Sequence, residues 1–426
     1  MTTYRFDGMH VTNHTFDLPL DHANAASTSI EVFAREIVAT ESRDSDLPYL
    51  VFFQGGPGFG APRPERRDGW LKRALRDYRV LLLDQRGTGL STPITAHGLS
   101  AFETPEAQAA YLSHFRADSI VRDAEAIRCA LLGRDERWSL MGQSFGGFCV
   151  LRYLSDAPEH VREAFVTGGI PPLTRPAEDV YRATYPRVQE KNRELFSRYP
   201  HLQAIAQAVA DALLDSDVRL PNGQRLTVEQ FQQLGIVLGG SAGREAIHYL
   251  LEGAFETVRG KRVLSAAFLY RVLGSLEYHT HPVFSVLHEA IYCQGEASSW
   301  AAARIRSAFP AFDYRPGAPF LFTGEMIYPW MFDQYRELRP LKAAAEVLAS
   351  KTDWPHLYDV DRLASNTVPL AAAVYFHDMY VDANYALETA QRVPNVKTWV
   401  TSEYEHDGLR TAGAKVLDRL IRMVRA

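Results

Sequence analysis

Short runs of apolar residues alternate with amphipathic segments along the first part of the chain. The runs are rich in β-branched, leucine and aromatic residues and end in glycine or aspartate, which is typical of buried strands. Four of them are predicted strands: 48–53, 78–84, 137–142 and 163–169. From Ile120 to Leu131 apolar residues recur at spacings of four, three and four, which predicts a helix over 117–132. Alternating strands and helices predict crossover connections and a mainly parallel sheet.

The pattern changes after Pro171, where a proline-rich segment interrupts the alternation. Most of the chain between there and residue 365 has a helical pattern, for example 262–276 and 336–350. The α/β pattern then returns, with predicted strands at 368–378 and 396–402, a helix at 384–393 and an amphipathic helix at the end of the chain. Without an internal repeat, this order favours an insertion over tandem domains. We expect an α/β core formed by residues 1–172 and 366–426, interrupted by a helical cap domain at 173–365.

Composition and charge narrow the function classes. The 426 residues are 46% hydrophobic and 23% charged, and the net charge is −5. This balance favours neither a nucleic acid nor an anionic membrane as a partner. The basic cluster 63–67 (RPERR) has no interleaved aromatic residues, so we interpret it as a solvated loop.

The few cysteines and the apolar runs predict the compartment. Cys129, Cys149 and Cys293 are too few and too scattered for a disulfide framework or a zinc cage, and they fit a reducing environment. The first residues show no secretory signal pattern, and apolar runs such as 369–376 are far shorter than a membrane span. We therefore expect a cytoplasmic protein that does not insert into membranes.

One serine lies between glycines at the end of a predicted strand. In WSLMGQSFGGFCV, the residues Gly142, Ser144 and Gly146 form the pattern G-x-S-x-G between a strand and a helix. A sharp turn of this kind lifts the serine hydroxyl above the sheet as a nucleophile. The alternative is a small residue in a tight connection. The five-residue pattern alone is weak, and the flanking strand and helix strengthen it.

A nucleophilic serine needs a base, and the base needs a carboxylate to orient it. Asp378 and His406 follow the predicted strands 368–378 and 396–402, in the chain order Ser, Asp, His that this kind of sheet uses. Asp382 is the competing acid, and the alternative for His406 is a surface loop histidine. The order favours Ser144, Asp378 and His406 as a catalytic triad.

Two backbone N–H groups must hold the negative charge that develops on the substrate oxygen. One is expected from Phe145, directly after the nucleophile, and the other from Gly55 and Gly56 in the QGGPG segment after the first central strand. A plain turn is the alternative for the glycines. We expect no cofactor and no metal, because the histidines at 279–282 and His288 lack the spacing of a zinc site and fit structural roles better.

Three segments resemble the proline iminopeptidases, which are serine peptidases of the α/β-hydrolase fold. They are FFQGGPGFG, LLLDQRGTGLS and MGQSFGGF, and the DQRGxGxS string is more specific than the serine turn. LHEAIYCQGE, FTGEMIYPWMF and HDMYVD resemble the longer bacterial form, so the resemblance covers nearly the whole chain. One departure is Gln54, where the family often has histidine. We assign Asp84 and Arg86 to positioning a loop.

The resemblance implies that the protein removes N-terminal proline from short peptides. An esterase or amidase that acts on small acyl groups with the same triad is the alternative, and a non-catalytic binding protein is a third hypothesis. A free prolyl amine brings a cation into a partly dry pocket, where it needs a carboxylate. The candidates are Glu289, Glu325 and, behind them, Glu252. By resemblance, family members use cap glutamates for this task; structural carboxylates are the alternative.

The pyrrolidine ring of the substrate needs an apolar, aromatic slot. Four aromatic residues lie close in sequence to the candidate glutamates, and core packing is the alternative role for each: Tyr292, Trp300, Tyr328 and Trp330. The oligomeric state is left open.

Overall fold

The computed structural model describes residues 2–24, 26–276, 278 and 280–426. Within them, one nine-stranded sheet has the order β1-β2-β3-β5-β4-β6-β7-β10-β11. The strands are β1 (Thr2–Phe6), β2 (Met9–Pro19), β3 (Ser29–Ala39), β4 (Tyr49–Phe53), β5 (Arg79–Leu83), β6 (Trp138–Gln143), β7 (Val161–Thr167), β10 (Leu370–Tyr375) and β11 (Val396–Thr401).

Every pairing from β5 to β11 is parallel, whereas β1, β2 and β3 join the sheet as antiparallel strands at one edge. The predicted mainly parallel α/β sheet is therefore confirmed, and all six predicted strands are present within about three residues of their expected limits. The antiparallel strands of the first 39 residues were not predicted. In β2, buried and exposed positions do not alternate regularly. The sequence therefore lacks the period of two that predicts a strand.

Helices cover both faces of the sheet because the central strands are buried on both sides. Along β4, Val51 and Phe53 pack into one apolar cluster, and Leu50 and Phe52 pack into the other. The first cluster includes α4 and α5, and the second includes α1 and α18. The helices of this part are α1 (Gly69–Ala74), α2 (Ala96–Leu99), α3 (Pro105–Leu112), α4 (Ala117–Leu132), α5 (Phe145–Asp156), α15 (Val360–Ala364), α16 (Ala383–Arg392), α17 (Gly408–Thr411) and α18 (Gly413–Arg425).

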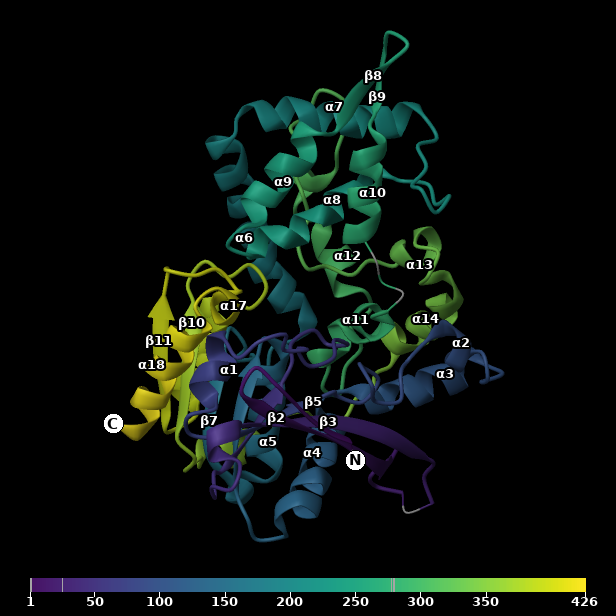
Figure 1. Ribbon diagram of the computed structural model, residues 1–426. Helices are drawn as coiled ribbons and strands as arrows, with labels where there is room; N and C mark the ends of the chain where they lie inside the picture. Colours follow the sequence, from purple (N-terminus) through teal and green to yellow (C-terminus); the bar gives the residue numbers. More distant parts are fainter. Residues whose placement is uncertain (1, 25, 277, 279) are drawn as a thin grey trace.

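The chain between β7 and α15 is mostly helical and gathers at one end of the sheet (Figure 1). Its helices are α6 (Ala177–Arg198), α7 (His201–Asp215), α8 (Val228–Gln233), α9 (Gly243–Glu252), α10 (Ala266–Ser275), α11 (Pro282–Leu287), α12 (Ala301–Arg306), α13 (Met331–Gln334) and α14 (Lys342–Ser350). We call this segment the cap. The expected domain limits after residues 172 and 365 fall between elements, and the division into domains itself stays a prediction.

A two-stranded hairpin projects from the tip of the cap, formed by β8 (Phe255–Val258) and β9 (Lys261–Leu264) (Figure 1). The sequence pattern predicted a helix from residue 262, but α10 begins only at Ala266, where the Ser265 hydroxyl accepts the Phe268 N–H at 3.1 Å. The hairpin turn has positive φ at both Arg259 and Gly260, as a two-residue turn that matches the twist of the strands requires. The helical periodicity of the residues after it concealed this short strand.

Membrane crossing requires a long apolar helix. None of the helices in the part of the chain that the structure describes combines the necessary length and apolar character.

Arg86 is a buried cation that joins three parts of the core. Its guanidinium is fully buried and donates to both carboxylate oxygens of Asp123 on α4, at 2.7 and 2.5 Å. It also donates to the carbonyl groups of Pro19, Leu20 and His114. The positioning role expected for Arg86 is therefore confirmed. Asp84 has a similar role, because its carboxylate accepts the N–H groups of Ala61 and Leu90.

Replacing Arg86 by methionine should strongly destabilise the fold. The substitution leaves the Asp123 carboxylate buried without its main counter-charge, which typically costs about 3–5 kcal/mol. Urea unfolding followed by circular dichroism measures the effect. Arg193→Met is the matched control, because Arg193 pairs with Glu190 on the exposed surface and its loss should change stability by less than about 0.5 kcal/mol. Equal stability of the two variants would contradict the assigned role.

Candidate active site

Ser144 occupies a sharp turn between the end of β6 and the start of α5. Its φ of 55° and ψ of −127° lie in a region that residues with side chains rarely adopt. The turn requires very close backbone packing on both sides. A Cβ at Gly146 would lie 1.9 Å from the Phe53 carbonyl oxygen, and a Cβ at Gly169 would lie 2.1 Å from the Ser144 carbonyl oxygen. The strand, the strained serine and the helix therefore have the form of a nucleophile turn.

Asp378 and His406 lie together after β10 and β11. His406 Nδ1 is 2.6 Å from Asp378 Oδ2, and both side chains are buried. The other Asp378 oxygen accepts the N–H groups of Tyr380 and Val381 at 2.8 and 3.1 Å. These bonds fix the carboxylate against the imidazole. The structure thus brings together the acid and the base that the sequence singles out.

The competing acid has a different task. Asp382 caps the N-terminus of α16, where its side chain accepts the N–H groups of Asn384 and Tyr385, and it pairs with Arg187 at 3.1 Å. Nothing in these contacts directs Asp382 toward His406.

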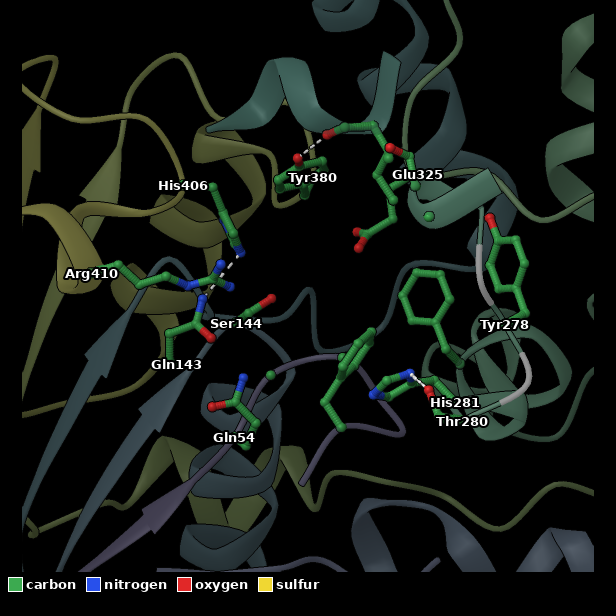
Figure 2. A pocket seen from close by; sticks show the side chains of 17 residues that line it. Gln54, Gln143, Ser144, Tyr278, Thr280, His281, Glu325, Tyr380, His406 and Arg410 are labelled. Carbon is green, nitrogen blue, oxygen red and sulfur yellow. Dashed lines mark hydrogen bonds between the residues drawn. The ribbon is translucent and has the colours of Figure 1, made fainter. Parts of the chain in front are cut away.

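The second nitrogen of His406 faces the serine side of the site. Its Nε2 lies 3.5 Å from the Gln143 amide nitrogen, and Gln143 directly precedes Ser144. The Asp378 carboxylate beside Nδ1 can only accept, which favours the tautomer with the proton on Nδ1 and a lone pair on Nε2. That tautomer is the one a general base needs. Figure 2 shows the Ser144 hydroxyl and the His406 ring directed into the same pocket.

Three successive residues of the loop after β11 are fastened to the cap. Glu405 accepts two hydrogen bonds of 2.8 Å from Lys191 on α6, and the His406 N–H donates to the Gly239 carbonyl at 3.1 Å. Asp407 accepts from both the N–H and the hydroxyl of Ser241. The position of the base therefore depends on the cap as well as on the sheet. These contacts have no signature in the sequence.

A cavity of about 440 Å³ opens in front of Ser144, between the sheet and the cap. This volume is within the range of small-ligand sites, about 300–1,000 Å³. Gly55 and Gly56 line it beside Ser144 and His406. The Phe145 N–H belongs to the first turn of α5, where no earlier helical carbonyl is available to it. Gly55 and Gly56 therefore border the cavity beside Ser144, and Phe145 directly follows the serine at the start of α5.

Glu325 is the candidate glutamate that lines this cavity. Burial raises the pKa of its carboxyl to about 7, the nearby His406 acts in the opposite direction, and Asp378 adds to the rise. His288 Nε2 lies 4.0 Å from the Glu325 carboxylate. Burial lowers the pKa of His288 to about 4, so this ring is neutral near pH 7 and supplies no full counter-charge. An incoming cation would compensate the Glu325 charge.

The other two candidate glutamates lie elsewhere. Glu289 is buried, and its two oxygens accept the N–H groups of Ala301 and Ala302 in the first turn of α12, at 3.1 and 2.9 Å. Burial raises the pKa of Glu289 to about 7, although these N–H groups lower it. Glu252 is exposed at the end of α9. Neither lines the cavity, and Glu289 acts here as a helix cap.

The aromatic wall of the cavity differs from the expected one. Phe59, Tyr278, Phe284 and Tyr380 line it, whereas the four aromatic residues near the glutamates in sequence do not. Tyr328, for example, is 1% exposed and its hydroxyl lies 3.0 Å from that of Tyr185. This aromatic wall comes from three segments that lie far apart in the sequence: the loop after β4, residues 278–284 and the loop after β10.

The histidines considered as metal ligands have other surroundings. His281 stacks on Phe59 and its Nδ1 lies 2.7 Å from the Thr280 hydroxyl, and His288 is buried beside Phe284. His279 lies outside the described residues. Across the described ranges, no group of three or more His, Cys, Asp or Glu side chains could hold a metal ion.

The parallel sheet, the strained serine and the Asp–His pair agree with the comparison to known families. Residues 48–411 match the family described as alpha/beta hydrolase fold, so the chain is an α/β hydrolase. It is 56% identical over 423 residues to a proline iminopeptidase of Aeromonas sobria, covering 99% of this chain and 98% of that protein. It is 36% identical over 415 residues to proline iminopeptidase aneH of Aspergillus aculeatus, covering 96% and 92%. The chain belongs to the proline iminopeptidase family.

The reactivity of Ser144 should depend on the titration of His406. Burial disfavours the charged imidazole, but the charge and hydrogen bond of Asp378, with a smaller effect of Glu325, outweigh burial and raise the pKa of His406 above its usual 6.5. A base must be neutral to accept a proton, so reactivity is lost as the pH falls through this raised value. Labelling of Ser144 by a fluorophosphonate should therefore be half-maximal above pH 6.5.

Asp378→Asn is the matched variant, because it removes the largest favourable charge beside the imidazole. Its labelling should be slower at every pH, and its midpoint should lie at a lower pH than that of the unmodified protein. Identical midpoints in the two proteins would contradict the assigned pairing of Asp378 with His406.

Proposed function

We propose that this protein is a serine exopeptidase that releases N-terminal proline from short peptides. The observation that carries the proposal is that one cavity contains Ser144, His406 and the buried carboxylate Glu325. The membership of the chain in the proline iminopeptidase family supports it. Acyl transfer needs the first two groups, and a substrate with a free amine next to its scissile carbonyl needs the third.

The reaction proceeds through an acyl-enzyme. His406 Nε2 accepts the Ser144 proton as the serine oxygen attacks the prolyl carbonyl carbon. The N–H groups of Phe145 and of the Gly55–Gly56 segment hold the resulting oxyanion. His406 then gives its proton to the leaving nitrogen, and the C–N bond breaks. A water molecule, deprotonated by His406, hydrolyses the ester and releases proline.

Glu325 binds the secondary ammonium group of the substrate. In a prolyl substrate this nitrogen is separated from the scissile carbon by a single carbon atom, so both must enter the same cavity. Glu325 is largely buried, and a charge there interacts strongly with an opposite charge because water screens it poorly. A peptide that continued beyond the amine would bring a neutral amide to this carboxylate. The arrangement therefore selects a free N-terminus.

Aromatic side chains of the cap and of the loop after β4 supply the apolar surroundings for the ring of proline. Phe59 and Phe284 pack edge to face at 5.6 Å in the cavity wall, and Tyr278 packs on Phe284. An apolar slot with one charged group is typical of small-ligand sites. We also propose a cytoplasmic location, which its cysteines support because Cys129, Cys149 and Cys293 are all free thiols.

Replacing Ser144 by alanine should abolish turnover of prolyl-p-nitroanilide. The variant loses the nucleophile, and losses of roughly 10⁴-fold or more are expected when a member of such a triad is removed. Initial rates measure the effect, and an unchanged circular dichroism spectrum shows that the fold is intact. Turnover within tenfold of the unmodified protein would overturn the mechanism.

Replacing Glu325 by glutamine should raise the KM for prolyl-p-nitroanilide. The neutral amide keeps the shape but loses the charge, which we expect to cost about 10- to 100-fold in kcat/KM. In the unmodified protein kcat/KM should fall as the pH drops through about 7, because the carboxyl of Glu325 becomes protonated there.

An N-blocked prolyl anilide provides the control for both proteins, since it has no ammonium group. The unmodified protein should hydrolyse it poorly, and the variant should discriminate less between the free and blocked substrates. Equal rates on free and blocked substrates in the unmodified protein would instead favour the esterase or amidase alternative.

A further inference from the structure

A second cavity of about 580 Å³ adjoins the catalytic one. Four residues line both cavities: Gln54, Phe59, Gln143 and Arg410. The outer walls of the second cavity come from the loop before α1 and the start of that helix, with Trp70 among them. The proposed mechanism uses the first cavity only and gives the second no role.

The direction in which the substrate chain lies in the site places its leaving group near the second cavity. The amine must lie at Glu325 and the scissile carbon at Ser144, so the rest of the peptide continues on the side away from Glu325. Figure 2 shows Glu325 on one side of Ser144 and Arg410 on the other. The residue after proline therefore arrives where Gln143 and Arg410 separate the two cavities.

Arg410 is the cation at this junction that has no counter-charge of its own. Arg63 pairs with the buried Asp84, and Arg66 lies 3.5 Å from Asp68. Across residues 2–24, 26–276, 278 and 280–426, no carboxylate forms an ion pair with the Arg410 guanidinium. The basic cluster that looked like a solvated loop thus lines the second cavity, but its charges are largely matched.

The guanidinium of Arg410 is close to the catalytic base. Both Arg410 and His406 line the first cavity, and the positive charge of Arg410 disfavours protonation of His406. His406 must protonate the leaving nitrogen. In a Pro-Xaa dipeptide, one carbon atom separates the free carboxylate from the leaving nitrogen. Because His406 must reach that nitrogen, the carboxylate would lie near His406 and therefore next to Arg410.

We propose that Arg410 recognises the free carboxylate of a Pro-Xaa dipeptide, and that the side chain of Xaa enters the second cavity. The proposal rests on the proposed function and specifies its substrate class as dipeptides. A guanidinium can bind a carboxylate through two parallel N–H···O bonds. The stacked rings of Phe52 and Trp70, 4.7 Å apart, provide an apolar surface for the side chain.

The test compares two substrates that differ in one charge, prolyl-alanine and prolyl-alanine amide. Replacing Arg410 by glutamine should lower kcat/KM for prolyl-alanine by about 10-fold or more, as loss of a charge-assisted hydrogen bond predicts. It should change kcat/KM for the amide by less than about twofold. Arg410→Lys should retain part of the preference, because it keeps the charge but loses the planar fork. Arg193→Gln, on the exposed surface of α6, is the control and should change neither rate.

Three results would overturn the proposal. Equal losses on both substrates would mean that Arg410 acts through His406, and unchanged rates on both would mean that it does not meet the substrate. Failure of the unmodified protein to release proline from either substrate is a different result, because it would refute the proposed function itself. A preference for the amide in the unmodified protein would also count against recognition of a carboxylate.

Discussion

The backbone conformation of Ser144 is the constraint on which the rest of the site depends. A positive φ at a residue with a side chain costs of order 1–3 kcal/mol and persists only where the surroundings enforce it. Here β6 is paired on both sides, by β4 and β7, and α5 starts at the next residue. Gly146 and Gly169 allow backbone to pack against backbone on either side of the turn. This packing holds the turn in place, and Ser144 lines the cavity directly before the first turn of α5.

Asp378 behind the imidazole and Glu325 in the cavity wall are two carboxylates with different surroundings. Asp378 accepts hydrogen bonds from two backbone N–H groups and from the imidazole of His406, so its negative charge is compensated within the protein. Glu325 has the neutral His288 at 4.0 Å, and burial raises its pKa to about 7 although the nearby His406 lowers it. These surroundings fit the roles that we propose, in which Asp378 orients a base and Glu325 meets a cation. A protein that leaves a buried acid under-compensated gives up some stability in the empty state, and the bound ammonium would restore it.

The sequence predicted the parts of the site that depend on strand ends. Ser144, Asp378 and His406 each follow a strand of the parallel sheet, and such residues meet at one edge whatever the intervening chain does. The cap was harder to predict. The packing of its helices decides which residues meet, and distance along the sequence says little about those contacts. Glu289 was therefore a candidate to meet an amine but caps α12, and Tyr328, which was considered for the aromatic slot, packs in the core as its other interpretation held. Gln143 and Arg410 were missed, although each lies within four residues of a predicted catalytic residue.

The attachment of the His406 loop to the cap also bears on how such enzymes diversify. Glu405, His406 and Asp407 are held by two parts of the cap, α6 and the segment around Gly239 and Ser241, so the cap helps to hold the proposed base. A recombination event that exchanged this cap for another would alter substrate choice and disturb the base at the same time. Enzymes whose histidine loop is hydrogen-bonded to the cap in this way should change specificity by substitutions within the cap. Their caps should be inherited together with the C-terminal strand and the loop that follows it.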